Sequence, residues 1–407
     1  MKKAFQSTLG LVSALIFVCI SQTASAQFKI KIPKISQPQP TATESSQPKP
    51  SGSQSTQPPA ERSNSAPAGG GPYARKPTPP DTPMLLAETL DLRAETWNYY
   101  WKAPGESSYT SWLPRVHCYV KYRGQARLRF KADYTMPDGR PWFSEMLEQK
   151  GGDEELSTSQ LESPYGTDDD KKTVAVPGVF GVKITNIKDN SIVFQGRFKV
   201  VKFKPANSDA RYKNLVDFYI DHDWLLPIGH TDVLYERADA HPYVCMWFKG
   251  GINATDLEAR LFFNGKALAT TDEGGNVGVV ERRSSKGAGN DPTLNWTLFR
   301  FSWPKKILFI VTDEARNYAA NRNRLYINQM PGEYTVKVFY KGEQVRETKF
   351  NIDAGNFADN GLAAQNGITT DKILLPVRIM GTADKWNAAT AKTAGFYGNP
   401  LSGFSVP

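Results

Sequence analysis

The chain has 407 residues and a formal net charge of +9, from 50 Lys and Arg against 41 Asp and Glu. Because both signs are intermixed along the sequence, this small excess does not predict a nucleic-acid footprint, which needs cations clustered on one face. Three cysteines are too few for the disulfide framework of a small secreted scaffold. We therefore expect apolar cores, and we expect no nucleic-acid partner.

The first residues have the pattern of a secretory signal. Lys2 and Lys3 form a positive start, Leu9 to Ile20 form an apolar run, and Ala24-Ser25-Ala26 supplies the small residues that a signal peptidase requires. The apolar run is too short to cross a bilayer comfortably. We predict a signal peptide over residues 1–26 and no transmembrane segment in the mature chain. The protein is then exported, and it is periplasmic, on the cell surface or secreted.

Residues 27–84 are dominated by Pro, Ser, Gln, Thr, Ala and Gly. A segment of this composition buries too little apolar surface to offset the entropy lost on ordering, so we predict a disordered linker. A plain spacer and a wall-spanning or protein-binding proline-rich arm are both compatible with it, and the spacer is favoured.

The rest of the chain repeats itself in four places, in the same order. We therefore predict a first repeat over residues 85–205 and a second over residues 206–354. The matched features are Leu90-Asp91-Leu92 before Trp97 with Val216-Asp217-Phe218 before Trp224, the equal spacings from Trp97 to Cys118 and from Trp224 to Cys245, Ala126 to Phe130 with Ala259 to Phe263, and Pro177 to Ile184 with Pro331 to Val338.

Apolar and polar residues alternate through these segments, as in Val116 to Arg123 and Phe180 to Thr185. A period of two predicts half-buried strands, and the intervening turn signals predict an antiparallel sandwich. The segment Pro-Gly-x-[Phe/Tyr]-x-Val-Lys-[Ile/Val], which occurs at Pro177 and at Pro331, resembles the last hairpin of bacterial immunoglobulin-like domains. The resemblance implies an all-β fold of two tandem antiparallel immunoglobulin-like β-sandwich domains, in which Phe180 and Tyr334 are corner residues.

Three segments depart from this repeat. Residues 272–291 of the second repeat are polar and rich in glycine, so we expect a mobile surface insertion, with a binding loop as the alternative. Residues 313–329 have the composition of a short helix. Residues 355–407 are predicted to be a loosely attached C-terminal extension with one strand between Ile373 and Met380.

The aromatic segment that begins at Trp97 offers candidate binding residues. Trp97 is assigned to the core because Trp224 repeats it, whereas Tyr100, Trp101 and Trp112 have no counterparts. Exposed aromatic side chains stack on sugars or anchor protein partners. We therefore select these three residues as candidates for a contact surface.

A metal site has weaker support. His222, His230 and His241 lie within 20 residues and have aspartates nearby, but their spacing matches no known histidine metal motif. We favour structural or solvated histidines and keep a metal site as the alternative. The run Asp168-Asp169-Asp170 is interpreted as a solvated loop, since it lacks the alternating ligand spacing of a calcium loop. No cofactor is predicted.

No catalytic motif stands out, and neither Cys118 nor Cys245 is accompanied by a plausible base. Our interpretation is an exported, non-catalytic binding or scaffold protein that recognises a cell-envelope protein or polysaccharide. The alternatives are an envelope-associated hydrolase or metal-dependent enzyme with its site in the loops of the second domain, and a purely structural spacer.

The two cysteines of the mature chain are predicted to be unbonded. Cys118 and Cys245 occupy equivalent positions of separate repeats, so each is expected to point into the core of its own domain. Two such cores lie further apart than a disulfide can span.

Overall fold

The computed structural model describes residues 73–74, 80–99, 109–123, 127–153, 157–204, 216–236, 239–284, 291–312 and 324–380. All of them belong to one compact unit, Ser65–Pro407. They form mostly antiparallel β-sheet, which confirms the predicted all-β class. The predicted signal peptide and nearly all of the predicted linker lie outside the described residues.

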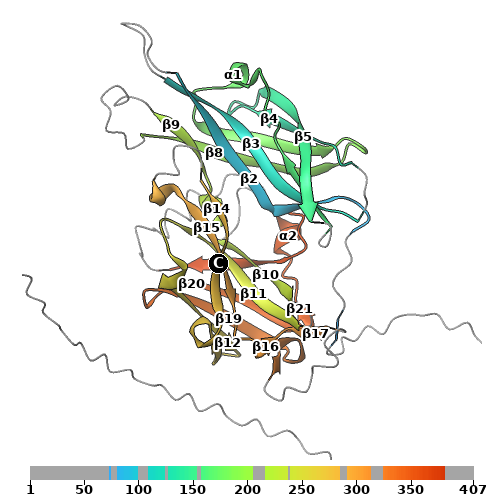
Figure 1. The fold of residues 1–407 in the computed structure, drawn as a ribbon, viewed down its shortest axis with the longest axis vertical. Coiled ribbons are helices and arrows are strands. Elements are labelled where there is room, and N and C mark those ends of the chain that lie inside the picture. Colours follow the sequence, from blue (N-terminus) through green and yellow to red (C-terminus); the bar gives the residue numbers. More distant parts are fainter. Residues whose placement is uncertain are drawn as a thin grey trace, which may run out of the picture. The chain divides into compact units, whose positions relative to one another are not determined.

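The first group of strands, coloured from blue to green in Figure 1, forms a sheet of eight in the order β2-β3-β6-β5-β4-β7-β8-β9. A short helix, α1 (Asp169–Lys172), lies in the connection between β6 and β7. The strands are β2 (Met84–Tyr99), β3 (Tyr109–Lys121), β4 (Phe130–Thr135), β5 (Pro141–Asp153), β6 (Thr158–Glu162), β7 (Gly178–Asn186), β8 (Ile192–Phe203) and β9 (Asp217–Asp221).

The second group of strands has the order β10-β22-β20-β19-β12-β13, with β11 and then β15 and β14 on the other side of β10. These strands are β10 (Ile228–Glu236), β11 (Asp239–Lys249), β12 (Leu257–Phe263), β13 (Lys266–Thr270), β14 (Asn276–Arg283), β15 (Trp296–Ser302), β19 (Gly332–Tyr340), β20 (Glu343–Asp353) and β22 (Ile373–Ile379).

Short elements complete the second group. They are β1 (Tyr73–Ala74), β16 (Ile307–Leu308), β17 (Ile310–Thr312), β18 (Leu325–Tyr326), β21 (Asn356–Phe357), α2 (Leu362–Gln365) and the 3₁₀ turns η2 (Asp223–Leu225), η3 (Ala254–Asp256), η4 (Thr271–Glu273), η6 (Pro292–Leu294) and η8 (Ile327–Gln329). The described part of the chain contains no helix with the length and apolarity needed to cross a bilayer.

The two groups pair their strands in the same order. In the first group, neighbouring strands follow the order β2-β3-β6-β5-β4-β7-β8-β9. In the second group, β10-β11-β15 correspond to β2-β3-β6, and β12-β19-β20-β22 correspond to β4-β7-β8-β9. Strands β14 and β13 together take the place of β5. The groups differ at this point: β5 pairs with both β4 and β6, whereas in the second group β13 pairs with β12 and β14 pairs with β15. The internal repeat is therefore visible as a repeated pairing order.

The ends of the two groups differ from the predicted boundaries. β9 pairs with β8, so the first group continues past residue 205 to Asp221. β22 lies between β10 and β20, so part of the predicted extension is an integral strand rather than a loose attachment. In the predicted linker, Tyr73 and Ala74 pair in parallel with β17. Local composition contains no information about these long-range partners.

The Pro-Gly segments that carry the sequence match occupy equivalent places. Gly178 and Gly332 have φ values of +144° and +142°, a region that favours glycine, at the start of β7 and of β19. Two residues later Phe180 and Tyr334 are fully buried. The Tyr334 hydroxyl donates a hydrogen bond of 2.9 Å to the backbone oxygen of Met330. This contact fixes the chain where it enters β19.

The buried residues form two apolar clusters, which we call the first and the second core. Trp112, Cys118 and Phe180 belong to the first core, and Tyr334 belongs to the second. Strand β11 contributes to both, because Val244, Met246 and Phe248 pack in the second core while Cys245 and Trp247 pack in the first. A strand buried on both faces has no polar alternation that would reveal which face points inward.

Cys245 therefore does not point into the core of its own strand group, which corrects the expectation that both cysteines do. The equal Trp-to-Cys spacing does not mark equivalent positions either: Trp97 lies in β2, whereas Trp224 lies in the 3₁₀ turn η2, before β10. The prediction of unbonded cysteines is confirmed, since both thiols are free and buried.

Part of the predicted surface insertion is also ordered within the sheet. Residues Asn276–Arg283 form β14, which pairs along β15, and the Arg283 side chain has no solvent exposure. Its Nε lies 2.7 Å from Glu281 Oε1 and 3.8 Å from Asp91 Oδ1. The arginine can be buried here because Asp91 of β2, 192 positions earlier in the chain, supplies a carboxylate beside it, and only the tertiary structure brings the two together.

Candidate functional site

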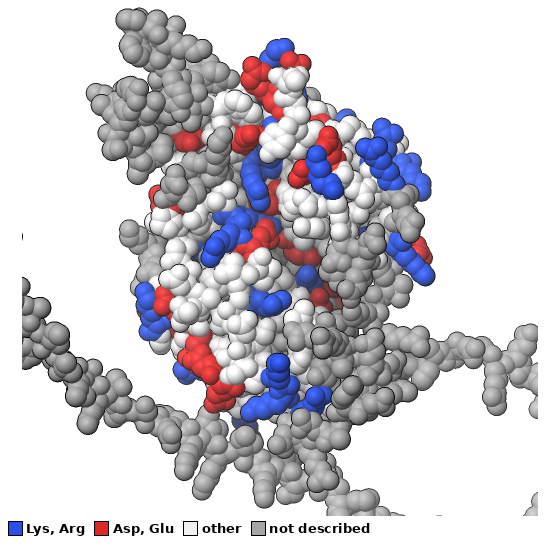
Figure 2. Space-filling view, viewed as in Figure 1, with Lys and Arg blue, Asp and Glu red and all other residues white. Residues whose placement is uncertain are grey.

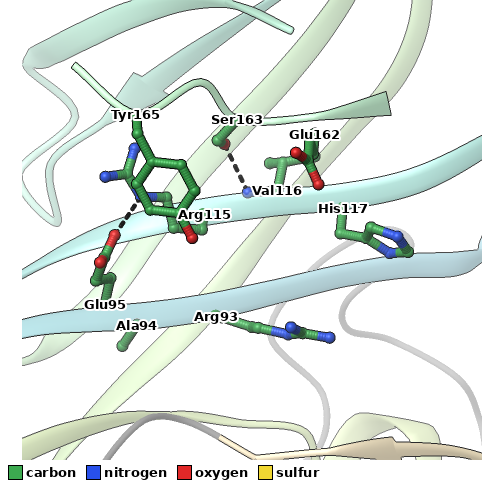
Figure 3. Close-up of a pocket in the computed structure, with 9 residues that line it drawn as sticks. All are labelled: Arg93, Ala94, Glu95, Arg115, Val116, His117, Glu162, Ser163 and Tyr165. Atoms are coloured by element: carbon green, nitrogen blue, oxygen red, sulfur yellow. Dashed lines mark hydrogen bonds and ion pairs between the residues drawn. The ribbon is translucent and has the colours of Figure 1, made fainter. Parts of the chain in front are cut away.

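The first strand group carries a small polar pocket with a volume of about 210 Å³. It lies over β2 and β3 and is closed on one side by the end of β6 and the turn that follows (Figure 3). The residues that line it are Arg93, Ala94, Glu95, Arg115, Val116, His117, Glu162, Ser163 and Tyr165.

Strand alternation places the polar side chains of β2 and β3 together. Arg93 and Glu95 alternate with buried Leu92 and Ala94, and Arg115 and His117 alternate with residues of the first core. The register sets Arg93 opposite Arg115 and Asp91 opposite His117. Cross-strand neighbours of this kind share one face of the sheet.

Arg115 organises the pocket. Its guanidinium donates three hydrogen bonds, to Glu95 Oε2 at 2.5 Å, to the Pro164 backbone oxygen at 2.7 Å and to Asp169 Oδ2 at 2.7 Å. Although burial opposes ionisation, the Gly166 amide and the Arg115 guanidinium lower the pKa of Asp169 to about 2. Arg115 is thus held by two carboxylates and one carbonyl, and its position is fixed.

Tyr165 lies over this fixed guanidinium. The centre of its ring is 4.7 Å from Arg115 Cζ, and 78% of the residue is exposed to solvent. Figure 3 shows the ring drawn flat in front of Arg115, at one end of the pocket. A cation against one face orients the ring and leaves the opposite face open to solvent.

The other end of the pocket is formed by Arg93, His117 and Glu162 (Figure 3). Partial burial lowers the pKa of His117, which keeps the imidazole neutral at pH 7, with one donor and one acceptor nitrogen. Glu162 lies 3.8 Å from Lys150 and accepts a hydrogen bond from Gln160. This end of the pocket therefore offers a ligand both hydrogen-bond donors and hydrogen-bond acceptors.

The Ser163 hydroxyl is fully engaged at the base of the pocket. It donates to Glu145 Oε1 at 2.6 Å and accepts from the Val116 amide at 2.8 Å. The Tyr134 hydroxyl donates to the same Glu145 oxygen at 2.8 Å. The Glu145 carboxylate therefore accepts from two hydroxyl groups, and burial raises its pKa, so these residues form a buried polar network beneath the pocket.

Trp112 is completely buried, which corrects the prediction that it belongs to an exposed contact surface. Its indole nitrogen donates to the Val176 backbone oxygen at 3.0 Å, and its ring packs against Phe180 at 4.8 Å. The residue lies in β3 on the inward face, where an aromatic side chain fills the core. The other two aromatic candidates, Tyr100 and Trp101, lie outside the described residues.

The three histidines are distributed over separate contacts. His222 and His230 are buried, with their rings against Trp296 and Tyr243 respectively, and His241 is partly exposed in β11. Within the described ranges no group of three His, Cys, Asp or Glu residues is arranged to hold a metal ion. In the aspartate run, Asp168 and Asp169 are paired with Lys171 and Lys172.

Sequence reasoning missed Tyr165 and Arg115. A signal was available for Tyr165, because the segment Ser163-Pro164-Tyr165-Gly166 places a lone aromatic in a turn that no core strand can absorb. No local signal distinguishes Arg115, whose partners are 20 and 54 positions away. Comparison of the sequence with protein-family models and with curated proteins gave no match.

Proposed function

We propose that this chain is an exported, non-catalytic binding protein of the cell envelope, and that the pocket beside Tyr165 takes a carbohydrate. The observation that carries the proposal is the open face of the Tyr165 ring, backed by the fixed Arg115 guanidinium. Sugar rings present an apolar face of C–H groups, which stacks on an aromatic ring, and a rim of hydroxyl groups, which hydrogen bonds to polar side chains.

The charges around the ring support a neutral sugar. The lining contains two arginines and two glutamates, so an uncharged hydroxyl-rich ligand finds both donors and acceptors without an excess of either sign. A volume of about 210 Å³ suits one sugar ring rather than a long segment of chain. The rest of a polysaccharide would extend along the open surface.

The engagement of the polar groups supports binding rather than catalysis. Glu95 is bonded to Arg115 and Glu145 is bonded to Ser163 and Tyr134. A general acid or base needs a free proton or lone pair within reach of the substrate. Glu95 and Glu145 each make contacts that hold the pocket in shape, which favours a preformed binding site.

The test is the binding of the mature chain to an array of envelope polysaccharides, followed by titration calorimetry with the best ligand. Replacing Tyr165 by Ala removes the stacking surface, and we expect the affinity to fall about tenfold or more. Tyr165→Phe keeps the ring and should retain most of the affinity. Ile192→Ala removes another exposed apolar side chain, in β8, and serves as the control.

Two results would overturn the proposal. One is an absence of saccharide binding by the unaltered chain together with capture of an envelope protein that depends on Tyr165. The other is saccharide binding that Tyr165→Ala leaves unchanged. Export is tested separately, by mass measurement of the chain recovered from the cell envelope or the medium, which should begin at Gln27. A chain that keeps residues 1–26 would contradict a removed signal peptide.

A further inference from the structure

A second hollow lies on another part of the eight-stranded sheet, over β5, β4, β7 and β8. It is larger than the Tyr165 pocket, with a volume of about 840 Å³, and none of its lining residues is shared with that pocket. The polar side chains that line it are Lys131, Asp133, Thr135, Ser144, Lys183, Gln195 and Arg197.

The charges in this hollow are unbalanced. Asp133 is its single carboxylate, and it is bonded to the Ser144 hydroxyl and lies 2.7 Å from Lys131 and 3.9 Å from Lys183. Arg197 is exposed and has no ion pair with any described residue. Three cations therefore face one occupied carboxylate, which leaves an excess of two positive charges for a ligand.

At Gly181 the floor of the hollow is bare backbone, because this residue has no side chain. Gly181 lies between Thr135 of β4 and Arg197 of β8 in the pairing register, and it has no side chain to stand above the sheet. The Thr135 hydroxyl oxygen lies only 2.2 Å from where a Cβ of residue 181 would be. A hydroxyl and a guanidinium thus flank a backbone floor that a flat ligand can approach closely.

The neighbouring aromatic rings argue against a nucleic acid as the ligand of this hollow. Phe143 is stacked on Tyr134 at 4.6 Å, and Trp142 packs edge-on against Phe143 and Trp112. Both Phe143 and Trp142 are partly buried and already pack against other rings, so little ring surface is left for nucleic-acid bases to stack on. Both edges of β7 are already paired, so an extended peptide cannot add to it as a strand.

We propose that this hollow is a second binding site and that it takes an acidic polysaccharide, with sugar carboxylates on Arg197 and Lys183 and ring hydroxyls on Thr135, Ser144 and Gln195. Guanidinium and ammonium groups form charge-assisted hydrogen bonds to carboxylates, and the hydroxyl and amide side chains suit the remaining sugar oxygens. The site does not depend on Tyr165, so it stands or falls independently of the function proposed above.

The experiment measures the affinity of the mature chain for polygalacturonate, for its fully methyl-esterified form and for dextran sulfate, by titration calorimetry at about 50 mM salt. We expect polygalacturonate to bind and the uncharged ester not to bind. Arg197→Gln should weaken binding of polygalacturonate about tenfold, and so should Lys183→Gln. Lys349→Gln, at an exposed ion-paired lysine of β20, is the matched control and should change nothing.

Each alternative has its own outcome. Equal binding of the esterified and free acids, or polygalacturonate binding that neither Arg197→Gln nor Lys183→Gln weakens, overturns the proposal. A thymidine oligonucleotide that binds as tightly as polygalacturonate, with the same dependence on Arg197, also overturns it, in favour of a nucleic-acid site. Binding of dextran sulfate but not of polygalacturonate would overturn the assignment of the site to sugar carboxylates. Tyr165→Ala should leave all these affinities unchanged.

Discussion

The two strand groups have the same order of pairing but differ in what their surfaces face. In the first group the outer face of β2 and β3 is hollowed and polar, and it carries Arg115 and Tyr165. In the second group the corresponding strand β11 is buried on both faces. The same pairing order therefore gives two different surfaces. A sheet face left open to solvent can bind a ligand, whereas a covered face packs against a neighbouring core.

The difference extends to charge. On the face of the molecule shown in Figure 2, Lys and Arg are interspersed with Asp and Glu. Around β14, in contrast, ionic groups are buried: Arg283 and Asp91 have no solvent exposure, and the Arg283 guanidinium lies 4.7 Å from the centre of the Trp247 ring. Buried ions of this kind are costly when one partner is removed.

The largest effect is expected from removing Arg283, which tests whether the buried ionic contact around β14 stabilises the fold. Arg283→Met leaves Asp91 buried with Arg93 as its main cationic partner, and we expect the free energy of unfolding to fall by about 3 kcal/mol. Urea titration measures this. Arg282→Met changes an exposed arginine of the same strand and should cost little. Equal effects of the two substitutions would show that the ionic contact does not stabilise the fold.

The second prediction concerns pH. Burial, which outweighs the attraction of Asp91, lowers the pKa of His222 to about 3 from an ordinary 6.5. Between these values the unfolded chain binds the proton and the folded chain does not, so stability falls as the pH falls through this window. The expected loss is about 2 kcal/mol between pH 8 and pH 5.

Chemical denaturation at a series of pH values measures this slope. His222→Gln should reduce it, because position 222 then has no imidazole to protonate, while His230, whose pKa burial also lowers, still contributes to the slope. His241→Gln, at a partly exposed position, is the control. A slope that His222→Gln leaves unaltered would exclude this histidine as its source.

The third prediction uses the cysteines, which lie in the same core although they belong to different strand groups. Replacing either by Ser buries a hydroxyl, and each change should cost about 1–3 kcal/mol. Alkylation of the denatured, unreduced mature chain should label two thiols, as the free state of both requires. A chain lighter by two hydrogens with neither cysteine labelled would contradict the structure.

The smallest effect is expected at the matched pair Phe180 and Tyr334. Only Tyr334 has a hydroxyl, and its hydrogen bond to Met330 should contribute about 0.5–1.5 kcal/mol. Tyr334→Phe removes this bond and makes the two positions alike. Thermal unfolding of the variant beside the unaltered chain measures the difference. An unchanged melting temperature in Tyr334→Phe would show that the corner contact adds no stability.

The sequence by itself determined the all-β class and the match between the two Pro-Gly segments. Both rest on local signals, namely a period of two along the strands and a glycine with positive φ at Gly178 and Gly332. The same local reasoning placed Trp112 at the surface, because it has no counterpart in the second repeat, although it is fully buried. It also placed Cys245 in the core of its own group, because a strand covered on both faces shows no alternation to read.

Tertiary structure alone decided the candidate sites. Arg115 is fixed by Glu95 and Asp169, Arg283 is placed near Asp91, and β22 is inserted between β10 and β20 by pairing with strands far away in the sequence. A side chain's neighbours across a sheet are set by register, and register depends on how the whole hydrophobic face is buried. Residue type and spacing therefore predicted the strands of this protein but not which of their polar side chains would meet.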